Sequence, residues 1–162
     1  MSWRLWAVLA VLAVLACGGD NKVVGGSGTV SGSVAGNSWT HIAAAYWIGK
    51  PAAGSPPVIL FLLEAPLDCP TISLLNWDKT IGVSQVLEIG LSEAAARTFH
   101  VPGDGVVAYL RDTLNPDADS ATITATAINP MRNLTGTFDA MFRTDRLQGT
   151  FDAAYCPRGV EP

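Results

Sequence analysis

The sequence predicts an all-β protein: a single antiparallel β-sandwich or a partly closed barrel of about nine or ten strands. Three observations lead to this prediction. From residue 29 onward, apolar residues mostly alternate with polar ones or form short runs bounded by Pro and Gly. A seven-residue unit recurs near the C-terminus with the spacing of two neighbouring strands. Helix is scarce, with only 70–77 and 92–97 predicted as one or two short helices.

Composition limits the class of protein. The chain has 162 residues, enough for one domain, with 10 Lys+Arg against 14 Asp+Glu and a formal net charge of −4. This weakly acidic balance argues against non-specific nucleic-acid binding, which needs a basic face. A hydrophobic fraction of 49% with 15% charged residues is too apolar for a disordered chain.

The first 16 residues are predicted to be a signal peptide. Arg4 is followed by an uninterrupted apolar run from Trp6 to Ala16. As a helix, this run would be roughly 16 Å long at about 1.5 Å per residue. A bilayer core of about 30 Å needs nearly twice that length. The run is therefore typical of a signal-peptide core and not of a membrane span.

Cys17 directly follows this apolar run. The small Ala16 before it and the Cys itself resemble the lipobox of bacterial lipoproteins. That resemblance implies a diacylated Cys17 thiol, cleavage before Cys17 and acylation of the new amine, so that membrane lipid is the first expected partner. Gly18 stands where inner-membrane lipoproteins carry an aspartate retention signal, which favours the outer membrane of the cell envelope. An ordinary secretory signal with a chance Cys, or a retained anchor, remains the alternative.

Residues 17–28 are predicted to be a flexible tether, and residues 29–162 the β-rich domain. The segment from Gly18 to Gly32 contains six glycines and two serines, a composition that gives a flexible linker. We therefore expect the folded domain to stand off the lipid surface.

The strands follow in order along the domain. Ala35-Gly36-Asn37 is predicted as the turn between the first two strands, and 103–105 as another turn. The run 58–63 is continuously apolar, which predicts a central strand covered on both faces. The strands expected before the terminal repeat are 29–34, 38–48, 58–63, 86–91, 98–101, 105–110 and 122–128.

The internal repeat predicts a closing hairpin. Residues 134–140 and 147–153 share the pattern Leu-x-Gly-Thr-Phe-Asp-Ala, with a period of thirteen. Alternation along a strand places Phe138 and Phe151 in the core. Asp139 and Asp152 then face solvent, and a carboxylate pair at a site is the alternative.

Cys69 and Cys156 are the cysteines that remain once Cys17 is acylated. An exported compartment is oxidising, so we expect them to form a disulfide. Two unpaired thiols are the alternative. No nucleophile motif surrounds either cysteine, so no catalytic residue is predicted.

Few other residues suggest a site, and each has an ordinary structural explanation. Trp47 and Trp77 are the aromatic residues expected to bind a glycan or a protein, although packing explains most such residues. His41 and His100 are expected on polar strand faces. Residues 115–120 place oxygen atoms as calcium loops do, but they lack the Gly and distal Glu of such loops, so a plain turn is favoured. No metal or cofactor is predicted.

The whole chain resembles uncharacterised small all-β lipoproteins of Gram-negative bacteria. The likeness rests on Cys17, the Gly-rich tether, the strand from Val30 to Gly36 and the closing Gly-Thr-Phe-Asp hairpin that ends at Cys156. It implies location and fold but transfers no activity. The sequence therefore predicts a non-enzymatic binding or structural module of the envelope, whose partner is an envelope protein or a glycan and not a nucleic acid. A carbohydrate-binding module, or a hydrolase with a spatially assembled site, is the alternative.

Overall fold

The computed structural model describes residues 26–39, 42, 44–49, 58–68, 84–111, 113–129 and 132–156, and for 44–49 it describes the backbone alone. These ranges contain strands, turns and loops, and no helix. The strands are β1 (Ser27–Val34), β2 (Asn37–Ser38), β3 (Ala44–Gly49), β4 (Val58–Leu63), β5 (Val86–Leu91), β6 (Thr98–Val101), β7 (Gly105–Leu110), β8 (Ser120–Asn129), β9 (Asn133–Phe142) and β10 (Asp145–Tyr155).

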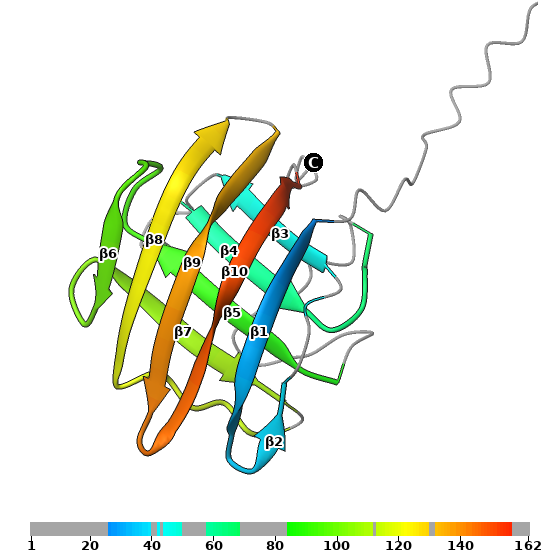
Figure 1. The fold of residues 1–162 in the computed structure, drawn as a ribbon, viewed down its shortest axis with the longest axis vertical. Helices are drawn as coiled ribbons and strands as arrows, with labels where there is room; N and C mark the ends of the chain where they lie inside the picture. The colour runs from blue at the N-terminus through cyan, green and yellow to red at the C-terminus, as the bar shows by residue number, and fades with distance from the viewer. Residues whose placement is uncertain are drawn as a thin grey trace, which may run out of the picture.

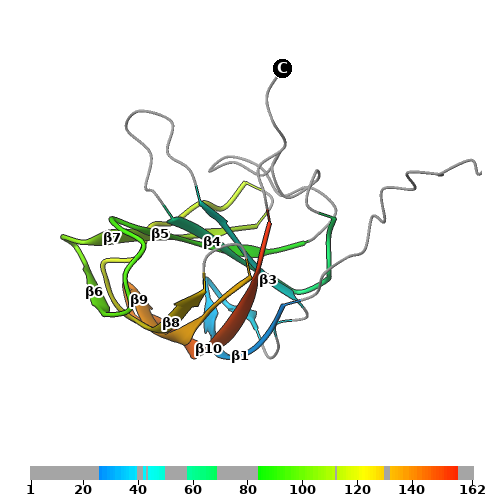
Figure 2. The ribbon, with the colours of Figure 1, turned by 90° about the horizontal axis from the view of Figure 1, so that it is seen from above.

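The strands form two layers packed face to face. The front layer has the order β6-β8-β9-β10-β1 and the back layer β3-β4-β5-β7, with antiparallel pairing within each layer. The strands of the two layers run at a clear angle to each other (Figure 1). Seen from above, the layers lie one over the other (Figure 2). The predicted antiparallel, all-β architecture is confirmed.

β10 joins the two layers. Along most of its length it lies between β9 and β1, but its last residues pair in parallel with β3 through Ala154–Tyr46 and Tyr155–Trp47. At the opposite side β6 and β7 are joined by a tight turn and do not pair with each other in the described residues. The layers are therefore not closed into a barrel, and the fold is a sandwich with one open side.

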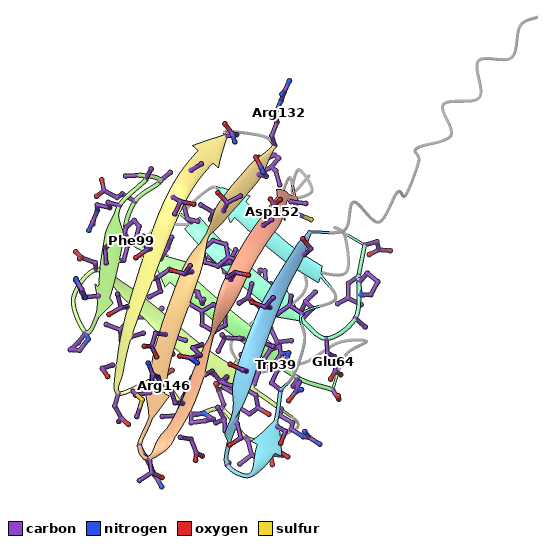
Figure 3. All side chains as sticks on the ribbon, viewed as in Figure 1. Trp39, Glu64, Phe99, Arg132, Arg146 and Asp152 are labelled. Carbon is purple, nitrogen blue, oxygen red and sulfur yellow. The ribbon has the colours of Figure 1, made fainter. Side chains whose placement is uncertain are left out.

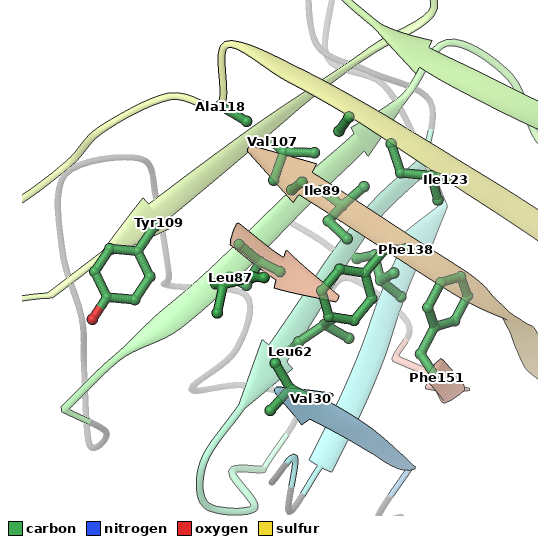
Figure 4. Packing of buried hydrophobic residues seen from close by; sticks show 14 of the residues in the cluster. Val30, Leu62, Leu87, Ile89, Val107, Tyr109, Ala118, Ile123, Phe138 and Phe151 are labelled. Atoms are coloured by element: carbon green, nitrogen blue, oxygen red, sulfur yellow. The ribbon is translucent and has the colours of Figure 1, made fainter. Parts of the chain in front are cut away.

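The main core lies between the layers. Alternating residues of β8, β9 and β10 point inward against the inner face of β4, β5 and β7. Figure 4 shows this packing around Leu62, Leu87, Ile89, Phe138 and Phe151. The largest completely buried aromatic side chains in the described part include Trp39, Tyr109 and Phe99.

A second apolar cluster lies on the other face of the back layer. Val58, Leu60 and Leu62 of β4 belong to the main core, whereas Phe61 and Leu63 belong to this second cluster. The prediction that 58–63 is a strand buried on both faces is therefore confirmed. The second cluster comprises Phe61, Leu63, Val86, Ala108, Leu110, Ala154 and Cys156.

The repeated unit forms the β9–β10 hairpin, as predicted. Its register places Gly136 opposite Phe151 and Gly149 opposite Phe138, so each phenylalanine lies beside the glycine of the other copy. A Cβ built on Gly136 would approach Phe151 Cζ to 2.6 Å, and one on Gly149 would approach Phe138 Cε1 to 3.0 Å. The glycines leave the space that the aromatic rings occupy, which explains why Gly and Phe recur together.

Three expectations about elements need correction. Residues 92–97 form bends and no helix, because backbone groups at both ends of this segment bond to other parts of the chain: the Ser92 N–H donates to the Asp104 carbonyl at 2.9 Å, and the Arg97 carbonyl accepts from the Ala125 N–H at 2.9 Å. The single strand expected at 38–48 is divided: β2 ends at Ser38, Ile42 forms an isolated bridge with Gly28, and β3 starts at Ala44. β1 begins at Ser27, two residues before the expected domain start. The other expected helix, 70–77, lies outside the described residues.

Candidate functional site

The outer face of the front layer is polar and rich in hydroxyl groups. Thr98 and Thr124 form a hydroxyl hydrogen bond of 3.1 Å across the β6–β8 pair, and Thr29 and Thr150 form one of 2.9 Å across the β1–β10 pair. Such cross-strand pairs stabilise a sheet. One in-register row crosses all five strands of this layer and consists of Thr98, Thr124, Thr137, Thr150 and Thr29.

Asp139 and Asp152 lie on this polar face, as predicted. Asp139 binds the Arg146 guanidinium through two contacts of 2.7 and 2.5 Å, and this hydrogen-bonded guanidinium lowers the pKa of Asp139. Asp152 accepts a hydrogen bond of 2.9 Å from Asn133. Because Asp152 pairs with Thr135, four residues from Asp139 along β9, the backbones of the two aspartates are offset by about 13 Å along the strands. They do not form a catalytic pair. Arg146 and Asp152 lie near opposite ends of the sheet (Figure 3).

Glu88 is the most unusual ionisable residue in the described part. It lies in the middle of β5 in register with Phe61 and Ala108, on the face that carries the second apolar cluster. The residue is 2% exposed, and its Oε2 atom has no hydrogen-bond partner among the described residues. Desolvation by this burial raises the pKa of Glu88 to about 8. The carboxyl is therefore mostly protonated at neutral pH.

Glu64 shows the opposite behaviour near the end of the adjacent strand. Its partial burial would raise its pKa, but hydrogen bonds from Ser84 and Gln85 and the nearby charge of Arg111 lower it overall. The Ser84 backbone N–H donates to Glu64 Oε1 at 2.6 Å. Glu64 thus serves to hold the chain that enters β5.

A groove lies at the open side of the sandwich, where β6 turns into β7. It has a volume of about 640 Å³, within the range of small-molecule sites. Val101, Pro102, Val106 and Val107 supply apolar walls. Gly103 in the turn has φ of 135°, a conformation that favours glycine, so the tight turn depends on this residue.

The polar groups of the groove come from the loop before β8. Asn115 and Asp117 line the groove, and Asp117 is exposed. The loop is fixed against β7 because the Tyr109 backbone N–H donates to the Pro116 carbonyl at 3.0 Å and the Ala118 backbone N–H donates to the Val107 carbonyl at 2.8 Å. Asp119 points elsewhere and accepts the Arg143 backbone N–H, which is ordinary turn chemistry.

Arg97 holds the other wall of the groove in place. Its guanidinium contacts Glu93 at 2.5 Å and Asp104 at 3.2 Å, and it lies 4.1 Å from the centre of the Phe99 ring. The hydrogen bond from Arg97 lowers the pKa of Asp104. Because Asp104 belongs to the β6–β7 turn, these contacts fix the turn that forms the groove wall.

The residues expected from sequence to form a site are mostly not gathered by the described structure. Four of them lie outside the described residues: Cys17, His41, Cys69 and Trp77. The side chain of Trp47 is not described either. His100 lies on the polar outer face of β6, as expected. Cys156 is completely buried in the second cluster.

Sequence reasoning missed the groove and Glu88. For Glu88 a signal was available, because it is the single carboxylate inside the otherwise apolar run Val86–Leu91. The groove had no comparable signal, because no motif in the sequence shows that residues 101–107 and 115–118 meet. Its described lining carries a carboxylate and an amide but no hydroxyl, thiol or imidazole, a set suited to binding.

No family model, curated protein or solved structure matches this chain. Within the described residues, no group of three or more His, Cys, Asp or Glu side chains is placed to hold a metal ion. The same part of the chain contains no helix of the length and apolarity needed to span a bilayer.

Proposed function

We propose that this protein is a lipoprotein of the bacterial cell envelope, anchored in the outer membrane by acyl chains on Cys17, which presents its β-sandwich as a non-enzymatic binding module. The observation that carries the proposal is the position of Cys17, directly after an eleven-residue apolar run that ends in Ala16. Three acyl chains on one residue would make the attachment effectively permanent, since a single chain gives only reversible binding.

The spacing between Cys17 and the domain supports this proposal. β1 begins at Ser27, an exposed residue, ten positions after Cys17 (27 − 17). Ten residues span at most about 35 Å when extended, and about 17 Å on average as a flexible Gly-rich chain. A domain tethered in this way stays close to the bilayer and still turns relative to it.

The groove lies at the far end of the sandwich from this attachment. Ser27 pairs with Asp152 at one end of the front layer, whereas the row of Val101 ends at Gly32 of β1. Five residues of strand separate these two rows, or about 17 Å. When the domain is oriented with the start of β1 toward the bilayer, a groove at the opposite end would face away from the lipid.

The proposed disulfide between Cys69 and Cys156 would stabilise the second cluster. Cys156 lies just after β10, is completely buried and packs among apolar residues of the back layer. A link between Cys69 and Cys156 closes a loop that spans 87 positions of the chain (156 − 69), which stabilises the fold by roughly 4 kcal/mol in the chain-entropy model.

Replacement of Cys17 tests the proposed anchor. A Cys17→Ser variant should move from the membrane fraction to the soluble fraction and should lose incorporation of a labelled fatty acid. The matched control is Cys69→Ser, which also removes one thiol but should remain in the membrane and retain the label. A Cys17→Ser protein that remains in the membrane would rule out acylation at this residue.

A further inference from the structure

We propose that the groove between the β6–β7 turn and residues 115–118 binds small organic cations that carry an ammonium group on an apolar body. This inference rests on the proposed role as a binding module and adds the chemical class of its ligand. The evidence is the apolar wall, the charge at the mouth of the groove and the fixed geometry of both sides.

The walls of the groove select an apolar body. Val101 of β6 and Val107 of β7 line the groove, and Val106 is 42% exposed, one of only two large hydrophobic residues exposed in the described part of the chain. Pro102 extends the apolar surface on the turn. A cavity of about 640 Å³ is large enough for a ligand with an aromatic ring or a short alkyl chain.

The charge at the groove selects a cation. Asp117 lines the groove, is exposed, and has no cationic side chain in contact with it among the described residues. The neighbouring acidic groups are already engaged, because Asp104 pairs with Arg97 and Asp119 accepts the Arg143 N–H. The Asp117 carboxylate is therefore available for a charge-assisted hydrogen bond to an ammonium group.

Both sides of the groove are held before any ligand arrives. Arg97 contacts Asp104 of the β6–β7 turn at 3.2 Å, and its guanidinium is itself held by Glu93 at 2.5 Å and by the Thr98 carbonyl at 2.9 Å. On the other side, the Ala118–Val107 backbone hydrogen bond of 2.8 Å fixes the loop that carries Asp117. A preformed groove loses little conformational entropy on binding.

The test is a titration of the mature full chain in lipid nanodiscs, followed by the amide signals of Gly103 and Gly105. The probes are phenethylammonium, its neutral alcohol analogue and 3-phenylpropionate, which share the apolar body and differ in charge. We expect saturable shifts at both glycines, with the ammonium about threefold to tenfold tighter than the alcohol and the carboxylate weakest.

Two variants separate binding at the groove from other effects. Asp117→Asn should reduce the affinity for the ammonium to that for the alcohol, and comparison in identical discs cancels partition of the probe into lipid. Asp152→Asn, which removes a carboxylate at the opposite end of the sandwich, should leave the ammonium affinity unchanged. The inference would be overturned by equal affinities for all three probes or by the absence of a saturable shift. Shifts that depend on the protein concentration and not on the probe concentration would overturn it as well. Membrane attachment through Cys17 is measured separately, so failure here leaves that proposal standing.

Discussion

Replacement of Glu88 by methionine should change how stability depends on pH. The folded chain holds this carboxyl in an apolar layer, where Oε2 has no partner in the described part of the chain, and desolvation raises its pKa from 4.5 to about 8. Because the folded pKa lies above the unfolded one, the protonated carboxyl is fully compatible with the fold below pH 4.5. Stability is then lost as the pH rises from about 4.5 to 8, and the loss levels off above that.

The magnitude follows from the size of the shift. A difference of about 3.5 pKa units corresponds to about 5 kcal/mol, at roughly 1.4 kcal/mol per unit. About 4 kcal/mol of this should be lost between pH 5 and pH 9. Methionine has a similar length and no charge, so Glu88→Met removes this dependence while it still fills the layer.

The assay is urea unfolding at pH 5, 7 and 9, followed by tryptophan fluorescence, with wild type and variant compared at each pH. The stability of Glu88→Met relative to wild type should increase by about 4 kcal/mol from pH 5 to pH 9. The difference in stability between variant and wild type at one pH cancels the contribution of all other titrating groups, because both proteins carry them. Asp117→Asn, which removes an exposed carboxylate, serves as control. A relative stability that is the same at pH 5 and pH 9 would refute the conclusion that Glu88 is protonated in the fold.

Two further predictions concern the hairpin and the cysteines. Gly136→Ala should destabilise the protein by about 1–3 kcal/mol, because the added Cβ meets Phe151 and the Thr124 carbonyl. The control is Thr137→Ala, which changes a residue on the outer face of the same strand. Equal unfolding midpoints for the two variants would contradict this account. Peptide mass spectrometry without reduction should find Cys69 linked to Cys156, and alkylation of both thiols in the native protein would disprove the link.

Much of the strand order could be predicted from the sequence because the signals were local. The runs 58–63, 86–91, 98–101 and 105–110 are strands with the expected bounds, since each is bordered by Pro, Gly or a polar turn. The repeat at 134–153 correctly indicated a hairpin with Phe138 and Phe151 inside. These elements depend on alternation and turn chemistry within a few residues.

The incorrect expectations depended on tertiary contacts. Ser92 to Arg97 has the composition of a short helix, but the Ser92 N–H bonds to the Asp104 carbonyl and the Arg97 carbonyl bonds to the Ala125 N–H. Similarly, 38–48 has strand-like composition, yet the buried Trp39 and the isolated bridge at Ile42 interrupt it. These contacts join residues 12, 28 and 14 positions apart (104 − 92, 125 − 97 and 42 − 28), beyond a local window.

The candidate site was harder to predict for the same reason. The groove forms where residues 101–107 meet residues 115–118, at the side of the sandwich where β6 and β7 do not pair in the described residues. No single motif encodes that arrangement. The location, by contrast, was inferred from a short local pattern that ends at Cys17.

Intact mass measurement of the amino-terminal peptide from membranes tests the central proposal most directly. Our account predicts a peptide that begins at Cys17, with the mass of a diacylglyceryl group on sulfur and a third acyl chain on the amine. A peptide that begins at Cys17 or later without lipid, or one that still carries residues 1–16, would contradict it.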